Sequence, residues 1–194
     1  TCRSTRWSSR RRAVSPEARL EEEAMAEENR PRVALETTLG RIVLELDPER
    51  APQTVANFLR YVDEGFYDGT VFHRVVRDFV IQGGGHTEDL ERKPTHAPIP
   101  NEARNGLRNV LGTISMARTA DPDSATSQFF ISVKDNSSSL DPGGVDAHGY
   151  AVFGQVVDGM DTVNEIRGVA VTTRAGHRSV PVDAVVVTRA GRLP

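Results

Sequence analysis

The sequence predicts a mainly β domain, a barrel capped by two α-helices. Short runs of alternating apolar residues, separated by turn residues, recur from Arg32 onward and are typical of antiparallel strands. Two segments instead space their apolar residues as an amphipathic helix does. With 194 residues, 38% of them hydrophobic, the chain can form one domain with a sizeable core. Many short strands with two helices favour a helix-capped barrel.

Residues 1–31 differ in composition from the rest and are expected to be a disordered N-terminal extension. Arginines among serines are followed by a run of glutamates, and charge blocks of this kind rarely pack. An arginine- and serine-rich opening is also a feature of mitochondrial transit peptides, but the apolar residues make a poor stripe for one. We favour the interpretation that the natural chain begins at Met25. The folded domain is expected to span residues 32–194.

The first predicted elements are a β-hairpin and a helix. Apolar residues alternate over residues 33–37 and 42–46, and Leu39 and Gly40 between them supply a turn, so the two runs are expected to pair. The helix is predicted from apolar residues at positions i, i+3, i+4 and i+7, namely Val55, Phe58, Leu59 and Val62. Proline at position 52 and glycine at position 65 are helix boundary signals.

Further short strands follow, and a second helix lies between the last two. The strands are expected at residues 69–76, 79–84, 112–117, 127–133, 150–157 and 184–188. The helix is predicted from the spacing of Met160, Val163 and Ile166. The two most polar and turn-rich stretches, 88–109 and 134–149, are the candidate site loops, because binding residues often lie on loops carried by a rigid scaffold.

Charge, cysteine content and hydropathy exclude several classes of protein. A formal net charge of −3 gives no electrostatic argument for a nucleic-acid partner. Cys2 is the single cysteine, so no intrachain disulfide can form. No stretch approaches the roughly 20 apolar residues that span a bilayer, and the N-terminus lacks the apolar region of a secretory signal. We expect a cytoplasmic protein that binds neither nucleic acid nor membrane.

The motifs of common hydrolases and nucleotide-binding proteins are absent. The sequence contains no G-x-S-x-G, no H-E-x-x-H and no G-x-x-x-x-G-K. The glycines at 83–85 follow an apolar strand without a lysine or a helix start behind them, so a turn or bulge is favoured over a phosphate cradle. The five histidines have no paired-ligand spacing, and we expect no metal and no cofactor.

A single arginine, Arg74, lies within the apolar run of residues 69–76. Pattern alone favours an arginine on the solvent face of an antiparallel strand over a catalytic arginine. Gln82 in the next strand could orient a guanidinium, and alternation places Val80 and Gln82 on one face. Both interpretations stay open at this point.

Two adjacent phenylalanines are expected to point to opposite faces of their strand. Alternation over residues 127–133 places Gln128 and Phe130 on one face and Phe129 on the other. One phenylalanine is therefore expected in the core, and the other is a candidate for a groove. By themselves, adjacent phenylalanines are more often both core residues.

Four motifs, in this order and spacing, resemble the cyclophilins, and most closely those of the bacterial cytosol. They are FHRVVRDFVIQGGG, NEARNGLRNVLGTISMAR, SQFFI and VFGQVVDGMDTVNEI. The resemblance covers roughly residues 32–188 and implies a closed eight-stranded antiparallel barrel capped by two helices. It also implies peptidyl-prolyl cis/trans isomerase activity that assists protein folding.

The resemblance implies roles for ten residues. Arg74 resembles the catalytic arginine, and Gln82 resembles its neighbouring glutamine. The expected substrate-binding residues are Phe79, Val80, Ala117, Arg118, Gln128, Phe130, Leu140 and Tyr150.

The chain also departs from the family pattern. Val80 stands where methionine is common, Arg118 where asparagine is frequent, and Tyr150 where many relatives have histidine. Ser139 stands where eukaryotic members often carry the tryptophan associated with cyclosporin binding, so only weak cyclosporin binding is expected.

The implied chemistry requires no nucleophile. Arg74 would donate a hydrogen bond to the prolyl nitrogen while the amide is twisted, because a guanidinium stays protonated. The expected partners are proline-containing peptides and flexible or unfolded protein segments, and the chain is expected to be a monomer. The main alternative is a chaperone or scaffold module that binds proline peptides without catalysis. A hydrolase is a more distant alternative, because no nucleophile–base pattern is present.

Overall fold

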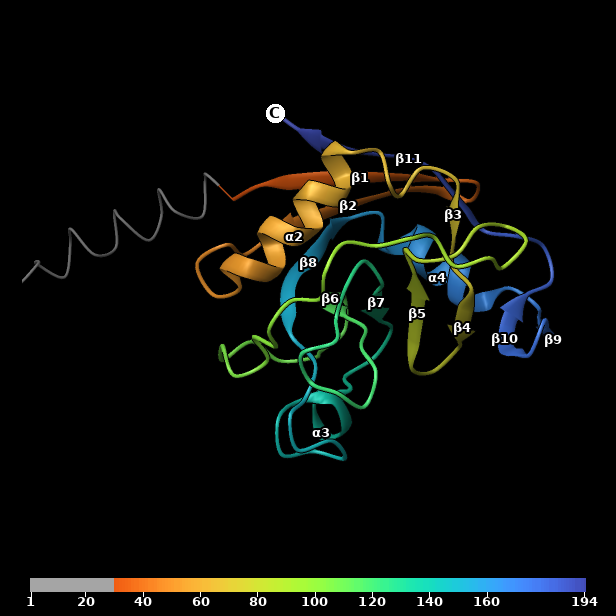
Figure 1. The fold of residues 1–194 in the computed structure, drawn as a ribbon. Coiled ribbons are helices and arrows are strands. Elements are labelled where there is room, and N and C mark those ends of the chain that lie inside the picture. Colours follow the sequence, from red (N-terminus) through yellow and green to blue (C-terminus); the bar gives the residue numbers. More distant parts are fainter. Residues whose placement is uncertain (1–29) are drawn as a thin grey trace, which may run out of the picture. The chain divides into compact units, whose positions relative to one another are not determined.

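Nine strands of the described chain form one antiparallel sheet, and two more form a separate hairpin (Figure 1). The computed structural model describes residues 30–194, so nearly all of the extension predicted at residues 1–31 lies outside the described residues. The main sheet has the order β3-β11-β1-β2-β8-β6-β7-β5-β4. Its strands are β1 (Arg32–Thr37), β2 (Gly40–Leu46), β3 (Thr70–Val71), β4 (Arg74–Val76), β5 (Val80–Gly83), β6 (Thr113–Met116), β7 (Phe129–Ser132), β8 (Val152–Asp158) and β11 (Val186–Leu193).

The main sheet is a strongly curled half-barrel and is not closed, so the expectation of a closed eight-stranded barrel is wrong in this detail (Figure 1). The two edge strands, β3 and β4, are successive pieces of one chain segment separated only by Phe72 and His73. Among the described strands, no hydrogen-bonded ladder joins β3 to β4, so the sheet keeps two edges. The mainly β class is confirmed.

Three helices accompany the sheet in the described chain, where two were expected. They are α2 (Pro52–Asp63), α3 (Ser137–Leu140) and α4 (Met160–Gly168). The two predicted helices correspond to α2 and α4. The apolar stripe of α2 is buried, and in α4 Val163 and Ile166 are buried while Met160 is partly buried. The additional helix, α3, is a single turn within the polar stretch 134–149, too short to give a periodic signal.

The predicted hairpin is confirmed, and its apolar face forms part of the core. In β1 and β2, Thr37 pairs with Gly40 at the turn. Val33, Ile42 and Leu44 are fully buried. Across the core, the ring of Phe58 on α2 lies 5.2 to 5.8 Å, centroid to centroid, from the rings of Tyr67, Phe129 and Phe153. Such aromatic contacts add stability beyond the apolar area that they bury.

The first turn of α2 is capped by a residue from a distant loop. Ala51 at the N-cap offers no side-chain hydrogen bond. Instead, the carboxylate of Glu102 accepts hydrogen bonds from the backbone nitrogens of Gln53, at 3.2 Å, and Thr54, at 2.8 Å. It also accepts one from the Thr54 hydroxyl at 2.7 Å. A carboxylate at this end is favourable because the first N–H groups of a helix have no partner within the helix.

Replacing Glu102 by alanine is therefore expected to lower the free energy of unfolding by about 1–2 kcal/mol. Urea unfolding followed by far-UV circular dichroism measures the change. Glu91→Ala, in the same loop at an exposed position, is the matched control and is expected to unfold near the wild-type midpoint. Equal midpoints for the two variants would contradict the capping role.

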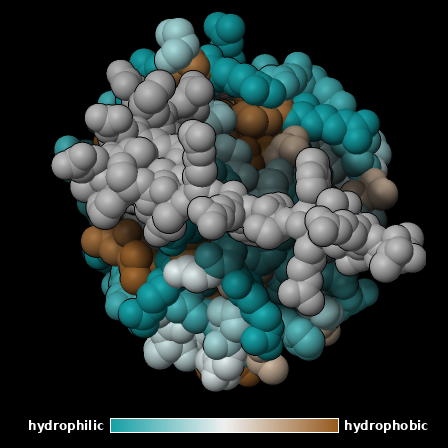
Figure 2. All heavy atoms as spheres, turned by 90° about the vertical axis from the view of Figure 1, so that its left-hand side faces the viewer, coloured by the Kyte–Doolittle hydropathy of each residue, from teal (hydrophilic) through white to brown (hydrophobic). Residues whose placement is uncertain are grey.

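The described helices and surface were compared with what a membrane-spanning segment requires. None of the helices at residues 30–194 is long and apolar enough to cross a bilayer. On the face shown in Figure 2, hydrophilic residues predominate among the described ones, and hydrophobic residues appear in small separate groups. Scattered groups of this size are normal on a protein surface.

Candidate active site

A pocket with an empty volume of about 580 Å³, partly open to solvent, lies between β4, β5, β7, α3 and the residues that flank β6 and β8. Its lining consists of nine residues, Arg74, Phe79, Val80, Gln82, Ala117, Arg118, Phe130, Leu140 and Tyr150. All nine are among the ten predicted site residues. The tenth, Gln128, is hydrogen-bonded to Gln82. The structure thus brings the predicted set together around one cavity.

One side of the pocket carries a row of polar side chains. Arg74 lies opposite Gln82 in the β4–β5 ladder, and its Nη1 donates a hydrogen bond to Gln82 Oε1 at 3.2 Å. Gln82 Nε2 in turn donates to Gln128 Oε1 at 3.2 Å. The row fixes the guanidinium of Arg74 through one of its five N–H groups and leaves others available at the cavity.

A glycine makes room for this row. A Cβ added at Gly85 would lie 2.4 Å from Cγ of Gln128, well inside contact distance. The close approach explains the glycine at this position, just beyond β5. Gly84 before it has a φ of +79°, as a turn requires.

The floor of the pocket is apolar. Val80, Phe130 and Leu140 form a buried cluster, and Phe79, Ala117 and Tyr150 pack against it. The neighbouring Phe129 points the other way into the main core, so the predicted division between the two phenylalanines is confirmed. The same alternation places Val80 and Gln82 at the cavity, as predicted.

The opposite wall is held by residues that the sequence did not single out. The carboxylate of Asp141 accepts hydrogen bonds from the backbone nitrogen and Nδ2 of Asn109, at 2.8 and 2.9 Å. Asn136 Nδ2 donates to the carbonyl of Phe79 at 2.8 Å. Of the two predicted site loops, only 134–149 contributes a lining residue, Leu140, while 88–109 supports that loop from outside. The only sequence signal was the polarity of both stretches.

Asp146 belongs to the same wall. Its carboxylate accepts hydrogen bonds from the backbone nitrogens of His148 and Gly149 and pairs with Arg118. These contacts, with that of His148 the largest, hold the pKa of Asp146 below its ordinary value. The loop therefore carries a stable negative charge beside Arg118.

Three of the five histidines gather beside the strand that carries Arg74. The ring of His73 lies 4.2 Å from that of His86 and 6.2 Å from that of His177, centroid to centroid. Both His73 and His86 are buried, and their Nδ1 atoms have no hydrogen-bond partner. Burial, reinforced by the neighbouring histidines and Arg74, lowers the pKa of His73 to about 3. Within residues 30–194, no group of three potential ligands is arranged to hold a metal ion.

The fold and the site together define a class of protein. It has a curled antiparallel sheet that carries a groove. In the groove, an arginine oriented by a glutamine lies beside a small apolar floor. Comparison with known proteins identifies the family. A family model described as "Cyclophilin type peptidyl-prolyl cis-trans isomerase/CLD" matches residues 32–192. The chain belongs to this family.

Bacterial relatives are similar over most of their length. The chain is 57% identical over 162 residues to the peptidyl-prolyl cis-trans isomerase cyp18 of Streptomyces antibioticus, covering 81% of this chain and 96% of that protein. It is 49% identical over 156 residues to peptidyl-prolyl cis-trans isomerase B of Escherichia coli, covering 80% and 95%. The chain is therefore a peptidyl-prolyl cis-trans isomerase of the cyclophilin type.

A solved structure supports the fold. A cyclophilin-type isomerase of Cryptosporidium parvum, determined in the presence of the dipeptide Ala-Pro, superposes with a TM-score of 0.69 at 24% identity. The match covers 84% of this chain and 99% of that one. The predicted cyclophilin fold is confirmed, apart from the closure of the barrel and the counts of strands and helices.

Proposed function

We propose that the pocket binds proline-containing segments and that Arg74 stabilises the twisted prolyl amide during isomerisation. The observation that carries the proposal is the position of Arg74, held by Gln82 at the edge of an apolar floor formed by Val80, Phe130 and Leu140. The floor offers contact to a pyrrolidine ring, and the guanidinium offers donors to the adjacent amide.

The proposed chemistry follows from the electronic structure of the amide. Resonance gives the C–N bond partial double-bond character and a rotation barrier of about 18–20 kcal/mol. At the twisted transition state, conjugation is lost and the prolyl nitrogen gains a lone pair that can accept a hydrogen bond. Arg74 donates to this lone pair without titrating, because a guanidinium stays protonated. No bond to the protein is formed.

The apolar floor complements the arginine. It holds the ring while the acyl side rotates, and its low polarity strengthens the charge-assisted hydrogen bond. Binding the twisted amide better than either planar form accelerates both directions of the reaction. A thousandfold acceleration requires only about 4 kcal/mol, which a charge-assisted contact together with fixation of the ring can supply.

The proposed substrate class is broad. The contacts required are to a proline ring and its backbone, so the side chain of the residue before proline has little influence on binding. The relative that was solved in the presence of Ala-Pro supports a dipeptide of this kind as the smallest probe.

An exchange measurement by NMR on an Ala-Pro peptide tests the proposal. Catalysis is expected to produce exchange between the cis and trans signals when a small amount of protein is added. Shifts of the peptide signals without exchange would support a non-catalytic binding module instead. The absence of both would contradict binding as well as catalysis.

A further inference from the structure

Arg118 follows the end of β6 and lines the pocket, yet its side chain is only 2% exposed. Its donors are occupied by the protein. Nε and Nη2 donate to the carbonyl of Gly149 at 3.1 and 2.8 Å, and Nη1 donates to the carbonyl of Thr119 at 2.9 Å. Nη2 also lies 2.8 Å from Oδ2 of Asp146. A guanidinium has five N–H groups, so these four contacts use all but one of them.

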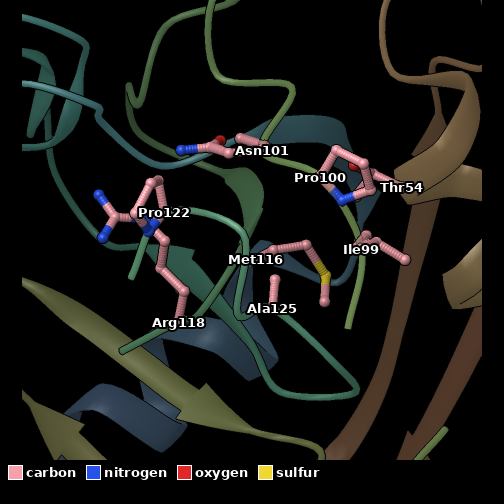
Figure 3. Close-up of a pocket in the computed structure, with 9 residues that line it drawn as sticks. Thr54, Ile99, Pro100, Asn101, Met116, Arg118, Pro122 and Ala125 are labelled. Atoms are coloured by element: carbon pink, nitrogen blue, oxygen red, sulfur yellow. The ribbon is translucent and has the colours of Figure 1, made fainter. Parts of the chain in front are cut away.

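The main acceptor, Gly149, is held from two sides. Its carbonyl also accepts a hydrogen bond from Asn101 Nδ2 at 3.1 Å. Its φ is +67°, and an added Cβ would lie 2.5 Å from the nitrogen of Pro142. Only glycine fits this position, and the donors of Asn101 and Arg118 fix the direction of its carbonyl. Figure 3 shows Asn101 and Arg118 together at a second, smaller cavity with an empty volume of about 210 Å³.

The next residue, Tyr150, is fixed by Arg118 as well. The guanidinium carbon of Arg118 lies 4.4 Å from the centroid of the Tyr150 ring, a cation–π contact. The ring of Phe130 lies 5.6 Å from the Tyr150 ring in an edge-on arrangement. Tyr150 is thereby held between the polar end of β6 and the apolar floor.

We propose that Arg118 is a positioning residue, whose guanidinium locks Gly149 and Tyr150 in place and so forms the second wall of the pocket before a peptide enters. This deepens the proposed function and rests on it. A buried guanidinium is costly unless its donors are paired, and the Arg118 guanidinium already makes four contacts, with Gly149, Thr119 and Asp146, so its main partners belong to the protein. The side chain acts through the wall and does not touch the reacting amide.

Hydrogen exchange of the loop at residues 146–150 tests the proposal without depending on activity. In Arg118→Ala, hydrogen exchange of residues 146–150 is expected to rise by about tenfold or more, the effect of losing charge-assisted hydrogen bonds. Arg118→Lys keeps the charge but lacks the planar fork, so it is expected to restore only part of the protection. In Asp146→Asn, which keeps the shape of the side chain, the exchange rate is expected to lie between those of the wild type and Arg118→Ala.

Steady-state kinetics separate positioning from contact with the substrate. Arg118→Ala is expected to raise KM about tenfold and to change kcat by less than about threefold, because a displaced wall weakens binding of ground and transition states alike. The matched control is Arg192→Ala, which removes an exposed bidentate ion pair with Asp63 outside the pocket and is expected to leave both readouts unchanged.

Two results would overturn the proposal. Unchanged exchange at residues 146–150 in both Arg118→Ala and Arg118→Lys would show that Arg118 does not hold the loop. A loss of kcat with unchanged exchange would show that the guanidinium acts on the substrate directly. If the wild-type protein failed to isomerise Ala-Pro, the function proposed above would fail, while the exchange measurement would still decide whether Arg118 fixes the wall.

Discussion

Replacing Arg74 by alanine is expected to lower kcat/KM for an Ala-Pro substrate by about 10²–10³-fold, the loss typical of removing one donor to a developing transition-state charge. The fold is expected to remain, because the side chain is only partly buried and its one hydrogen bond joins it to Gln82. NMR exchange spectroscopy measures the rate, and a urea unfolding curve checks the stability of the variant.

Two further variants define the role of Arg74. Arg77→Ala is the matched control, since Arg77 lies three residues further along, in the turn between β4 and β5, and is exposed. It is expected to keep near wild-type turnover. Arg74→Lys keeps a positive charge without the planar fork that Gln82 orients, so an intermediate rate is expected. Near-normal turnover of Arg74→Ala would contradict the assigned role.

The sequence predicted those parts of the fold and site that depend on local periodicity. Strict alternation was enough to place Val80 with Gln82 on one face of their strand, and Phe130 opposite Phe129 in another, because side chains of a strand point alternately to its two faces. Pattern alone did not decide the role of Arg74. An arginine on the solvent face of the strand fits the same alternation. Only the combination of four motifs favoured a catalytic arginine.

Other features could not be predicted, because they depend on tertiary contacts. All four residues of strand β9 (Val171–Arg174) are exposed, so the hairpin that it forms with β10 (His177–Pro181) has no apolar alternation to reveal it. Its turn residues, Ala175 and Gly176, both have positive φ, as a tight hairpin turn requires.

The contacts of Arg118 were also beyond prediction. Those with Asp146, Gly149 and Tyr150 reach 28 to 32 positions further along the chain through an irregular loop, and no periodic signal marks such a path. The gathering of His73, His86 and His177 has the same origin. It depends on how the β9–β10 hairpin packs beside β4.

This histidine cluster is expected to make the protein sensitive to mild acid. The pKa of His73 is about 3 in the folded chain, against an ordinary value of 6.5, because burial disfavours the imidazolium and His86, His177 and Arg74 add repulsion. Between these two values the unfolded chain binds a proton that the folded chain does not. Stability is therefore fully present above pH 6.5 and falls as the pH is lowered, by up to about 1.4 kcal/mol per pH unit for this one proton.

Urea unfolding between pH 5 and 7 measures this slope in a window above the ordinary pKa values of the carboxyl groups. His86, whose pKa is also lowered, mainly by burial, contributes with the same sign. His73→Gln is expected to flatten the pH dependence by about one proton, whatever its effect on stability at pH 7. His148→Gln, at an exposed position outside the cluster, controls for the loss of a histidine as such. Two results would contradict this account: an unchanged pH slope of stability in His73→Gln, or an imidazole signal of His73 that titrates near pH 6.5. Either would show that the buried ring accepts a proton at little cost. The acid sensitivity would then have to originate elsewhere in the chain.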